Sequence, residues 1–453
     1  MMQLYEKPVI GKLRGGLMNK FGRSPAYARK VREDIDGVPV SKLVEDYGSP
    51  LFVYSEKTLR HRIRQMRNAF TTRYPNVVSG WSYKTNYLQA VCALMHQEGA
   101  LAEVVSGMEY QKARALGVPG EQIIFNGPRK PIPMLRTAAD EGAMIHVDHL
   151  DEVADLEDVA SELGRPVPVG LRLNLDAGIY PQWSRFGFNL ENGQALSAVK
   201  RIVSNGKLII NGLHCHIGTF IMDPAAYARQ TTKLVAFAYA LQDRFDLSID
   251  YLDIGGGFPS RSRLKGVYLP ADIAVPSIDA YAESIADALS SNLRPGDFPR
   301  LIVESGRALV DEAGYLISTV VASKRLADGT RAYVADAGVN LLPTSVWYNF
   351  NIEMDREVPG VNENSVIYGP LCMNIDVVAE TVSLPPLTRG TRLIFSTVGA
   401  YNNTQWNQFI DYRPNVVLVG ENGDVDVIRE AESLEDVARR ERMPARFCAE
   451  TTS

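Results

Sequence analysis

The segment Tyr251–Pro259 reads YLDIGGGFP, a short apolar run that leads directly into three consecutive glycines. A short run of this kind is typical of a strand that is buried on both of its faces. Comparable runs recur on both sides of this segment: Leu51–Tyr54, Leu101–Val105, Gln122–Phe125, Met144–Val147, Val167–Leu173, Leu208–His214 and Arg300–Val303. The sequence therefore predicts a series of buried strands that extends over most of the first 310 residues.

Amphipathic stretches with helical periodicity lie between these runs: Glu56–Thr71, Tyr87–Gly99, Glu109–Leu116, Leu150–Leu163 and Ile278–Leu289. Strands that alternate with helices pair in parallel. Strand–helix units that recur over about 250 residues predict a TIM-type (β/α)8 barrel rather than an open sheet. In such a barrel the active site lies at the carboxyl ends of the strands.

The pattern changes after about residue 310, where strands continue and helices become scarce. Runs such as Thr319–Val321, Arg331–Val334 and Arg392–Ser396 predict a separate, mostly antiparallel β domain. We therefore divide the chain into an N-terminal segment over residues 1–47, a barrel over 48–310 and a C-terminal β domain over 311–453. The N-terminal segment is expected to pack on the β domain.

Composition and charge narrow the function. The 453 residues are 45% hydrophobic and 22% charged, as in a soluble globular protein, and the net charge of −5 offers no basic surface to nucleic acid. No run approaches the roughly 18 apolar residues of a membrane helix, and residues 1–20 lack the apolar stretch of a signal peptide. We expect a cytoplasmic protein that binds neither nucleic acid nor membrane.

The cysteines show neither a metal-binding nor a disulfide pattern. Cys92, Cys215, Cys372 and Cys448 are far apart and form no CxxC pair. We therefore predict free thiols and no metal centre.

Lys84 lies in the segment Ser82–Asn86, which reads SYKTN and ends the second apolar segment. A single lysine on a strand is usually an exposed residue. The alternative is an amine at the barrel mouth, where burial lowers the pKa enough for the amine to attack an aldehyde.

The three glycines Gly255, Gly256 and Gly257 follow a predicted strand. Their backbone N–H groups are unobstructed and form a nest for an anion such as a phosphate, although a flexible turn is the other interpretation. The spacing matches neither GxxxxGK[ST] nor GxGxxG, which disfavours a nucleotide loop.

Two histidines end another predicted strand. His214 and His216 lie two residues apart and point to the same side, and Thr219 follows with a hydroxyl for a phosphate. The pair fits packed side chains, a metal pair or an imidazole stacked on a planar cofactor. A metal pair would need further ligands, which no HExxH motif or cysteine cluster supplies.

Glu304 and Arg307 end the last predicted barrel strand, in the sequence ESGR. They either pair with each other or act separately, Glu304 on a cationic ring nitrogen and Arg307 on an anion. In the β domain, Tyr401 offers a phenol to a phosphate or substrate. Cys372 also lies in the predicted β domain, and a free cysteine is usually a small, buried hydrophobic residue.

These segments together resemble the fold-type III pyridoxal-phosphate-dependent decarboxylases, which include diaminopimelate and ornithine decarboxylases and share their barrel with alanine racemases. The resemblance extends from about Ser41 to Asn407. It rests on the ordered set SYKTN, EVVSGME, FNGPRK, SRFGF, HCHIGT, GGGFP, ESGR, GPLC and GAY. Each motif alone is weakly specific, whereas the ordered set is highly specific.

The resemblance implies that pyridoxal 5'-phosphate is bound by Lys84, Glu103, Arg172, His216, Thr219, Gly255, Gly256, Gly257, Glu304, Arg307 and Tyr401. Lys84 would form the Schiff base, with Glu103 and Arg172 nearby, and His216 would stack on the pyridine ring. Thr219, the glycines, Arg307 and Tyr401 would bind the phosphate.

Further roles follow from the same resemblance. Glu304 would bond the pyridine nitrogen and favour its protonation, which supports loss of CO2 from an amino acid. Cys372 would enter the active site of the other subunit of a homodimer and protonate Cα, with Lys84 as a second candidate. His214 would be a further neighbour of the cofactor. Racemases that resemble this fold carry Arg at the position of Glu304. The carboxylate in this chain therefore disfavours racemisation.

The chain departs from the family at the substrate end. Met373 stands where diaminopimelate decarboxylases have a Glu for the distal amine, and Leu342-Pro343 stands where they have an Arg before the proline. Arg185 replaces a usual Lys in SRFGF. Asp336 and Asp376 either meet a cationic substrate tail or are structural.

These departures predict an atypical substrate. Met373, Trp347, Tyr348 and Trp406 suggest that its distal end is more apolar or aromatic. The alternatives to a decarboxylase are a racemase and a non-catalytic regulatory homologue.

Overall fold

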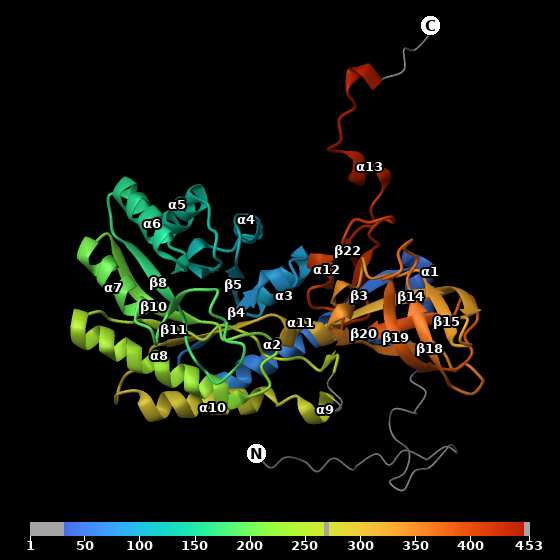
Figure 1. Ribbon diagram of the computed structural model, residues 1–453, viewed down its shortest axis with the longest axis horizontal. Coiled ribbons are helices and arrows are strands. Elements are labelled where there is room, and N and C mark those ends of the chain that lie inside the picture. The colour runs from blue at the N-terminus through green and yellow to red at the C-terminus, as the bar shows by residue number, and fades with distance from the viewer. Residues whose placement is uncertain (1–30, 267–270, 448–453) are drawn as a thin grey trace.

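Eight parallel strands close into a barrel in the computed structural model, which describes residues 31–266 and 271–447 (Figure 1). In barrel order the strands are β4 (Val77–Ser82), β5 (Leu101–Val104), β6 (Ile123–Phe125), β7 (Met144–Val147), β8 (Val167–Asn174), β10 (Leu208–Cys215), β11 (Tyr251–Asp253) and β13 (Arg300–Ser305). Pairing of β13 with β4 closes the ring, so the predicted TIM-type barrel is confirmed.

Helices surround the barrel, as the alternation in the sequence predicts (Figure 1). They are α2 (Glu56–Thr71), α3 (Gln89–Gln97), α4 (Gly107–Ala115), α5 (Ile132–Asp140), α6 (Leu150–Leu163), α7 (Gln194–Asn205), α8 (Pro224–Phe245) and α10 (Ile278–Asn292). Local signals set their ends: the hydroxyl of Ser55 accepts the Thr58 N–H at the start of α2, and Gly164 ends α6 in the left-handed conformation.

One predicted barrel strand lies elsewhere. Strand β3 (Leu51–Ser55) pairs antiparallel with β14 (Gly314–Arg325) and parallel with β21 (Val416–Val419), so it belongs to the second sheet. The prediction that residues 51–54 begin the barrel was wrong, and β4 takes that place. All five residues of β3 are buried. A short strand buried on both faces carries no pattern that indicates which sheet it joins.

The second sheet is mixed and mostly antiparallel. Its central order is β19 (Val377–Leu384), β18 (Glu363–Tyr368), β15 (Arg331–Ala335), β14, β3, β21 and β22 (Val425–Arg429). Strand β20 (Arg392–Ser396) pairs with both β14 and β17 (Asn351–Met354). The pairs β15–β18 and β3–β21 are parallel, and the other pairs named here are antiparallel.

The described part of the N-terminal segment lies against this second sheet. Arg32 forms an ion pair with Glu353, and α1 (Val40–Tyr47) packs with Ile317 and Ile394 in one apolar cluster. Residues 1–30 lie outside the described residues.

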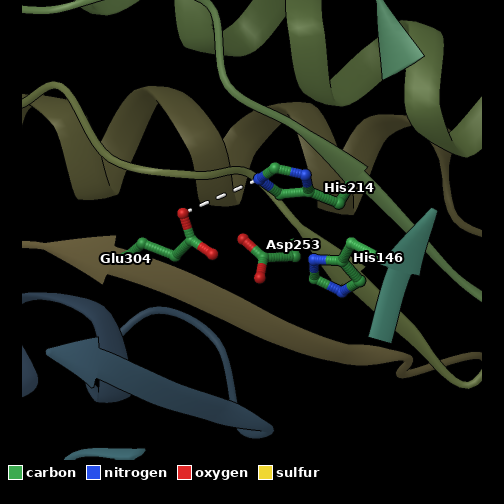
Figure 2. A group of neighbouring side chains, drawn as sticks. All are labelled: His146, His214, Asp253 and Glu304. Carbon is green, nitrogen blue, oxygen red and sulfur yellow. Dashed lines mark ion pairs between the residues drawn. The ribbon is translucent and has the colours of Figure 1, made fainter. Parts of the chain in front are cut away.

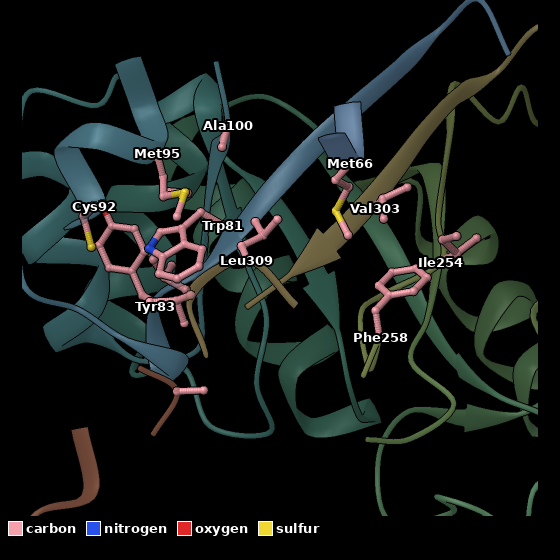
Figure 3. Close-up of a cluster of buried hydrophobic side chains, with 14 of the residues drawn as sticks. Met66, Trp81, Tyr83, Cys92, Met95, Ala100, Ile254, Phe258, Val303 and Leu309 are labelled. Atoms are coloured by element: carbon pink, nitrogen blue, oxygen red, sulfur yellow. The ribbon is translucent and has the colours of Figure 1, made fainter. Parts of the chain in front are cut away.

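Apolar side chains fill the space between the barrel strands and the surrounding helices. Figure 3 shows part of this layer, where Trp81 of β4 and Val303 of β13 belong to the same cluster as Met66 of α2 and Met95 of α3. This packing fixes β4, which directly precedes the turn of Lys84, and β13, which carries Glu304. Within the described ranges, no helix is long and apolar enough to span a membrane.

Candidate active site

Lys84 lies in a short 3-10 turn (Tyr83–Thr85) directly after β4, at the carboxyl end of the barrel. The β domain holds this turn in place. The Tyr401 N–H donates to the Thr85 carbonyl over 2.8 Å, and the Thr404 hydroxyl donates to the Lys84 carbonyl over 3.0 Å. The site is therefore built where the two sheets of one chain meet.

The amine of Lys84 has a buried acidic partner. Lys84 Nζ lies 2.6 Å from Glu103 Oε2, and Glu103 lies on the neighbouring strand β5. Burial lowers the pKa of an amine, but attraction to Glu103 and Glu304 outweighs it, so the pKa of Lys84 lies above its ordinary value. The prediction that burial lowers the pKa of the Lys84 amine is therefore wrong for the cofactor-free chain.

The glycine turn after β11 is closely packed and rigid in shape. Gly255 and Gly257 have φ values of +66° and +97°, which favour glycine. A Cβ on Gly256 would lie 2.4 Å from the Glu304 carbonyl oxygen, and one on Gly257 would lie 2.2 Å from the Gly218 carbonyl oxygen. Only glycine fits, so the turn is a preformed backbone cradle rather than a flexible link.

His216 lies beside this cradle. Its Nδ1 accepts the Gly256 N–H over 3.0 Å, which requires that this nitrogen carry no proton. Burial and the nearby Lys84 lower the pKa of His216 to about 3, so the ring is neutral at physiological pH. Trp183 meets the ring edge-on at 5.2 Å, and Thr219 is exposed three residues further on.

Arg307 is fixed between two phenols. Its guanidinium lies 4.5 Å from the ring centre of Tyr348 and 5.0 Å from that of Tyr401, and it forms a 3.1 Å ion pair with Asp311. Arg307 therefore pairs with Asp311 and not with Glu304, so the interpretation in which the two residues of the ESGR motif pair with each other is wrong. Tyr348, which the sequence suggested for the substrate end, packs on Arg307.

Four buried side chains in the barrel interior offer ligand atoms within 4.8 Å of one another: His146, His214, Asp253 and Glu304 (Figure 2). The rings of His146 and His214 stack at 4.6 Å with an angle of 12° between their planes. Their in-plane lone pairs therefore lie in nearly parallel layers and do not converge on one ion. Hydrogen bonds also occupy both nitrogens of His146, so the group is a polar network rather than a metal site.

Burial sets the protonation of three side chains in this network. Burial lowers the pKa values of His146 and His214 well below their ordinary value, so both rings are neutral. Burial and the neighbouring Glu304 raise the pKa of Asp253 well above its usual range. The 3.6 Å contact between His214 Nε2 and Glu304 Oε2 is too long for a hydrogen bond.

Buried polar atoms around Lys84 lack a partner within the described chain: Thr85 Oγ1, His214 Nδ1, His214 Nε2, Asp253 Oδ2, Ser305 Oγ and Arg307 Nε. Buried polar groups are normally satisfied, so such a concentration indicates a place for a polar ligand. A backbone cradle beside a buried arginine suits a phosphate, and a neutral imidazole suits a flat ring. The residues therefore fit pyridoxal phosphate.

A family model described as "Pyridoxal-dependent decarboxylase, pyridoxal binding domain" matches residues 56–311, more than half of the chain. The chain belongs to the pyridoxal-dependent decarboxylases. It is an enzyme that uses pyridoxal 5'-phosphate to decarboxylate an amino acid.

Known relatives extend this likeness over nearly the whole chain. Diaminopimelate decarboxylase of Bacillus subtilis is 31% identical over 422 residues, which are 90% of this chain and 94% of the relative. The crystal structure of the diaminopimelate decarboxylase of Methanocaldococcus jannaschii has a TM-score of 0.84 at 27% identity and covers 92% of this chain and 98% of its own. Lysine/ornithine decarboxylase of Vibrio vulnificus has a TM-score of 0.71 at 25% identity, over 84% of this chain and 97% of its own.

Several residues suggested by the sequence lie in the β domain of this decarboxylase. Cys372 is exposed in the loop between β18 and β19, and Met373 is half-buried beside it. Asp376 accepts the Val339 and Leu371 N–H groups, each over 2.8 Å. The carboxylate of Asp376 therefore fixes the loop that carries Cys372, which favours the structural interpretation.

Asp336 has a similar set of contacts. It accepts hydrogen bonds from Ser49 Oγ at 2.6 Å, Ser318 Oγ at 2.7 Å and the Thr319 N–H at 2.8 Å. Both carboxylate oxygens of Asp336 therefore accept hydrogen bonds from uncharged donors. Trp406 packs edge-on against Phe52, so it too supports the fold.

Arg172 is buried on β8. Its guanidinium stacks over Phe186 at 4.5 Å and lies 3.6 Å from Asp148. Four further polar residues of the site, Asn126, His146, Tyr251 and Asp311, were not predicted from the sequence. The available signal was a polar residue within an otherwise apolar strand, such as the histidine in Met144–Val147.

Proposed function

We propose that Lys84 is the residue that joins this decarboxylase to its cofactor, and that the substrate is an amino acid with an atypical distal end. The observation that carries the assignment is the pairing of Lys84 with Glu103 at 2.6 Å beside the unsatisfied polar atoms of the barrel mouth. Among the groups at this barrel mouth, the amine of the half-buried Lys84 is the nucleophile that an aldehyde requires.

Each neighbouring residue has a task that its chemistry supports. Lys84 must lose a proton before it attacks an aldehyde, and Glu103 is close enough to accept that proton. The cradle of Gly255, Gly256 and Gly257 would bind the phosphate with Thr219, Arg307 and Tyr401. Neutral His216 would lie against the ring, and Arg172 would lie nearby.

Glu304 is placed to control charge on the cofactor ring. An ionised carboxylate only accepts hydrogen bonds, so it favours the protonated form of a ring nitrogen. When bound, pyridoxal phosphate supplies a ring that accepts the electron pair released when the carboxylate departs as CO2. The buried surroundings of Glu304 exclude water from this exchange.

Return of a proton to Cα is assigned to Cys372 of the partner subunit, with Lys84 as the second candidate. The exposed thiol on a fixed loop supports this arrangement, which places the active site at the interface of a homodimer. We also propose a cytoplasmic location and the division into residues 1–47, 48–310 and 311–453, with β3 contributed to the second sheet.

The far end of the substrate differs from that of diaminopimelate in this proposal. The M. jannaschii relative has been crystallised with L-lysine, and several relatives are named diaminopimelate decarboxylases. In this chain Met373 replaces the acid expected for a distal amine, and Leu342-Pro343 lacks the expected Arg. Asp336 and Asp376 do not compensate, because neutral donors already satisfy their oxygens.

The test is CO2 release from a panel of amino acids that includes diaminopimelate, lysine, ornithine and conjugated diamino acids. We expect release from at least one member and weak activity on diaminopimelate. Exchange between D and L forms without CO2 would favour a racemase, which the carboxylate of Glu304 disfavours. Cofactor binding with neither reaction would favour a regulatory homologue.

A further inference from the structure

A line of buried polar side chains connects Glu304 to the opposite side of the barrel interior. The Asn126 amide nitrogen lies 2.5 Å from Glu304 Oε1 and 3.0 Å from Glu103 Oε1. The Asn126 amide oxygen lies 2.6 Å from His146 Nδ1, and His146 Nε2 lies 3.1 Å from the Tyr251 hydroxyl. One amide therefore joins both carboxylates that flank Lys84 to a histidine and a tyrosine.

The direction of every hydrogen bond in this line follows from the carboxylates. Ionised carboxylates only accept, so the Asn126 NH2 group must donate to Glu103 and Glu304. Its oxygen then faces His146, so the hydrogen of the neutral ring must be on Nδ1. Nε2 is left as an acceptor for the hydroxyl of Tyr251.

The barrel makes room for these side chains with two glycines. Gly170 and Gly212 lie on β8 and β10, between His146 on β7 and Tyr251 on β11, and the four residues are in register. A Cβ on Gly170 would lie 2.4 Å from His146 Cδ2 and 2.5 Å from the Tyr251 hydroxyl. A Cβ on Gly212 would lie 2.0 Å from Tyr251 Cζ, so alanine at either position would displace the line.

We propose that Tyr251, His146 and Asn126 are positioning residues that hold Glu304 in the orientation that protonates the cofactor ring nitrogen. The inference rests on the proposed role of Glu304. Asn126 holds Oε1, which leaves Oε2 as the oxygen for the ring. It also lies between Glu304 and Glu103, which keeps one carboxylate for the ring nitrogen and the other for Lys84.

The test uses Asn126→Leu, His146→Leu and Tyr251→Phe, loaded with pyridoxal phosphate that carries ¹⁵N in the ring. The ¹⁵N chemical shift reports protonation of the ring nitrogen directly. We expect the wild type to show the protonated value and Asn126→Leu to move toward the unprotonated one, with His146→Leu and Tyr251→Phe moving successively less. Loss of a hydrogen bond to a charged group predicts about a 10- to 100-fold lower kcat for Asn126→Leu, with a much smaller change in KM.

Two controls separate positioning from general damage. His146→Asn keeps an N–H donor close to the position of Nδ1 and should restore most of the ¹⁵N shift lost in His146→Leu. Tyr333→Phe removes another fully buried hydroxyl, from β15 of the second sheet, and should leave the shift at the wild-type value. Tyr251→Phe keeps the ring volume, so it provides a measurement even where the leucine variants do not fold.

The outcomes distinguish this inference from the proposed function. A wild type that binds no pyridoxal phosphate overturns both, and one whose ring nitrogen is unprotonated overturns this inference together with the proposed role of Glu304. A protonated wild type with the same shift in Asn126→Leu and Tyr251→Phe overturns the positioning role alone and leaves that of Glu304 intact.

Discussion

The carboxylates at the barrel mouth and those in the β domain have opposite surroundings. Asp336 and Asp376 accept hydrogen bonds from neutral hydroxyl and backbone donors that use both oxygens. Glu103 and Glu304 instead face an amine and a shared amide, close to buried polar atoms that lack partners. The carboxylates of Asp336 and Asp376 hold the fold, whereas those of Glu103 and Glu304 lie beside an amine and beside polar atoms that are open to a ligand.

The difference has a consequence for the loop that carries Cys372. Asp376 holds the Leu371 N–H, one residue before Cys372, and the Val339 N–H on a separate segment. The carboxylate of Asp376 therefore fixes the loop that exposes the thiol of Cys372. We assign this thiol to the active site of the other subunit. In the proposed function, the two kinds of carboxylate would serve one reaction, the first by orienting a loop and the second by direct contact.

The strongest test of the barrel mouth is Lys84→Ala. Loss of the amine removes the nucleophile, so we expect no borohydride-trapped cofactor adduct and a fall in turnover of at least about 1,000-fold. Absorbance of the purified protein and mass spectrometry of the trapped adduct measure this. Lys207→Ala, at a lysine outside the site, serves as the control. An adduct that persists in Lys84→Ala would assign the chemistry to another amine.

The second test concerns the exposed thiol. Cys372→Ala should retain cofactor binding but lower kcat by about 100-fold, the usual size of a proton-transfer contribution. Protonation in D2O, followed by NMR of the product, should also lose stereochemical purity. Cys92→Ala changes a buried thiol of α3 and is the control. Unchanged turnover and product in Cys372→Ala would remove this residue from the mechanism.

Much of the fold could be predicted because it depends on local patterns. Alternating strands and helices specify the barrel, and the glycines after Tyr251–Ile254 mark a close approach of backbone to backbone. The assignment of β3 failed because a strand buried on both faces fits either sheet. Its partners β14 and β21 lie more than 250 residues away, and no local signal identifies them.

The candidate site could be predicted only for residues that occur in recognisable motifs. The pKa of Lys84 was misjudged because it depends on Glu103, a partner on the next strand. Asn126 follows β6, His146 lies on β7 and Tyr251 begins β11, so their hydrogen bonds exist only after the barrel closes. Asp376 could not be separated from a substrate contact until its backbone donors were known.

The third test addresses the satisfied carboxylates. Asp376→Asn places an NH2 group against backbone donors, or loses one acceptor, and should lower the free energy of unfolding by about 1–3 kcal/mol. KM for the substrate should stay close to the wild-type value if the role is structural. Urea unfolding and steady-state kinetics measure the two quantities. A large rise in KM with unchanged stability would instead make Asp376 a substrate contact.

The smallest predicted effect is the pH dependence of stability in the cofactor-free protein. His214 is neutral when folded because burial holds its pKa well below the value of about 6.5 that it has in the unfolded chain. Above pH 6.5 neither state binds the proton. Below pH 6.5 the unfolded chain binds a proton that the folded chain does not, so stability falls as the pH is lowered.

Each such histidine contributes a slope of about 1.4 kcal/mol per pH unit. His214→Gln should therefore flatten the decline in the free energy of unfolding between pH 6 and pH 5 by about that amount, whatever its effect on stability at pH 7. His61→Gln removes an exposed histidine of α2 and should leave the slope close to that of the wild type. An unchanged slope in His214→Gln would mean that the imidazole of His214 takes up a proton while the barrel is still folded. Glu304, which lies 3.6 Å away, would then have a cationic neighbour.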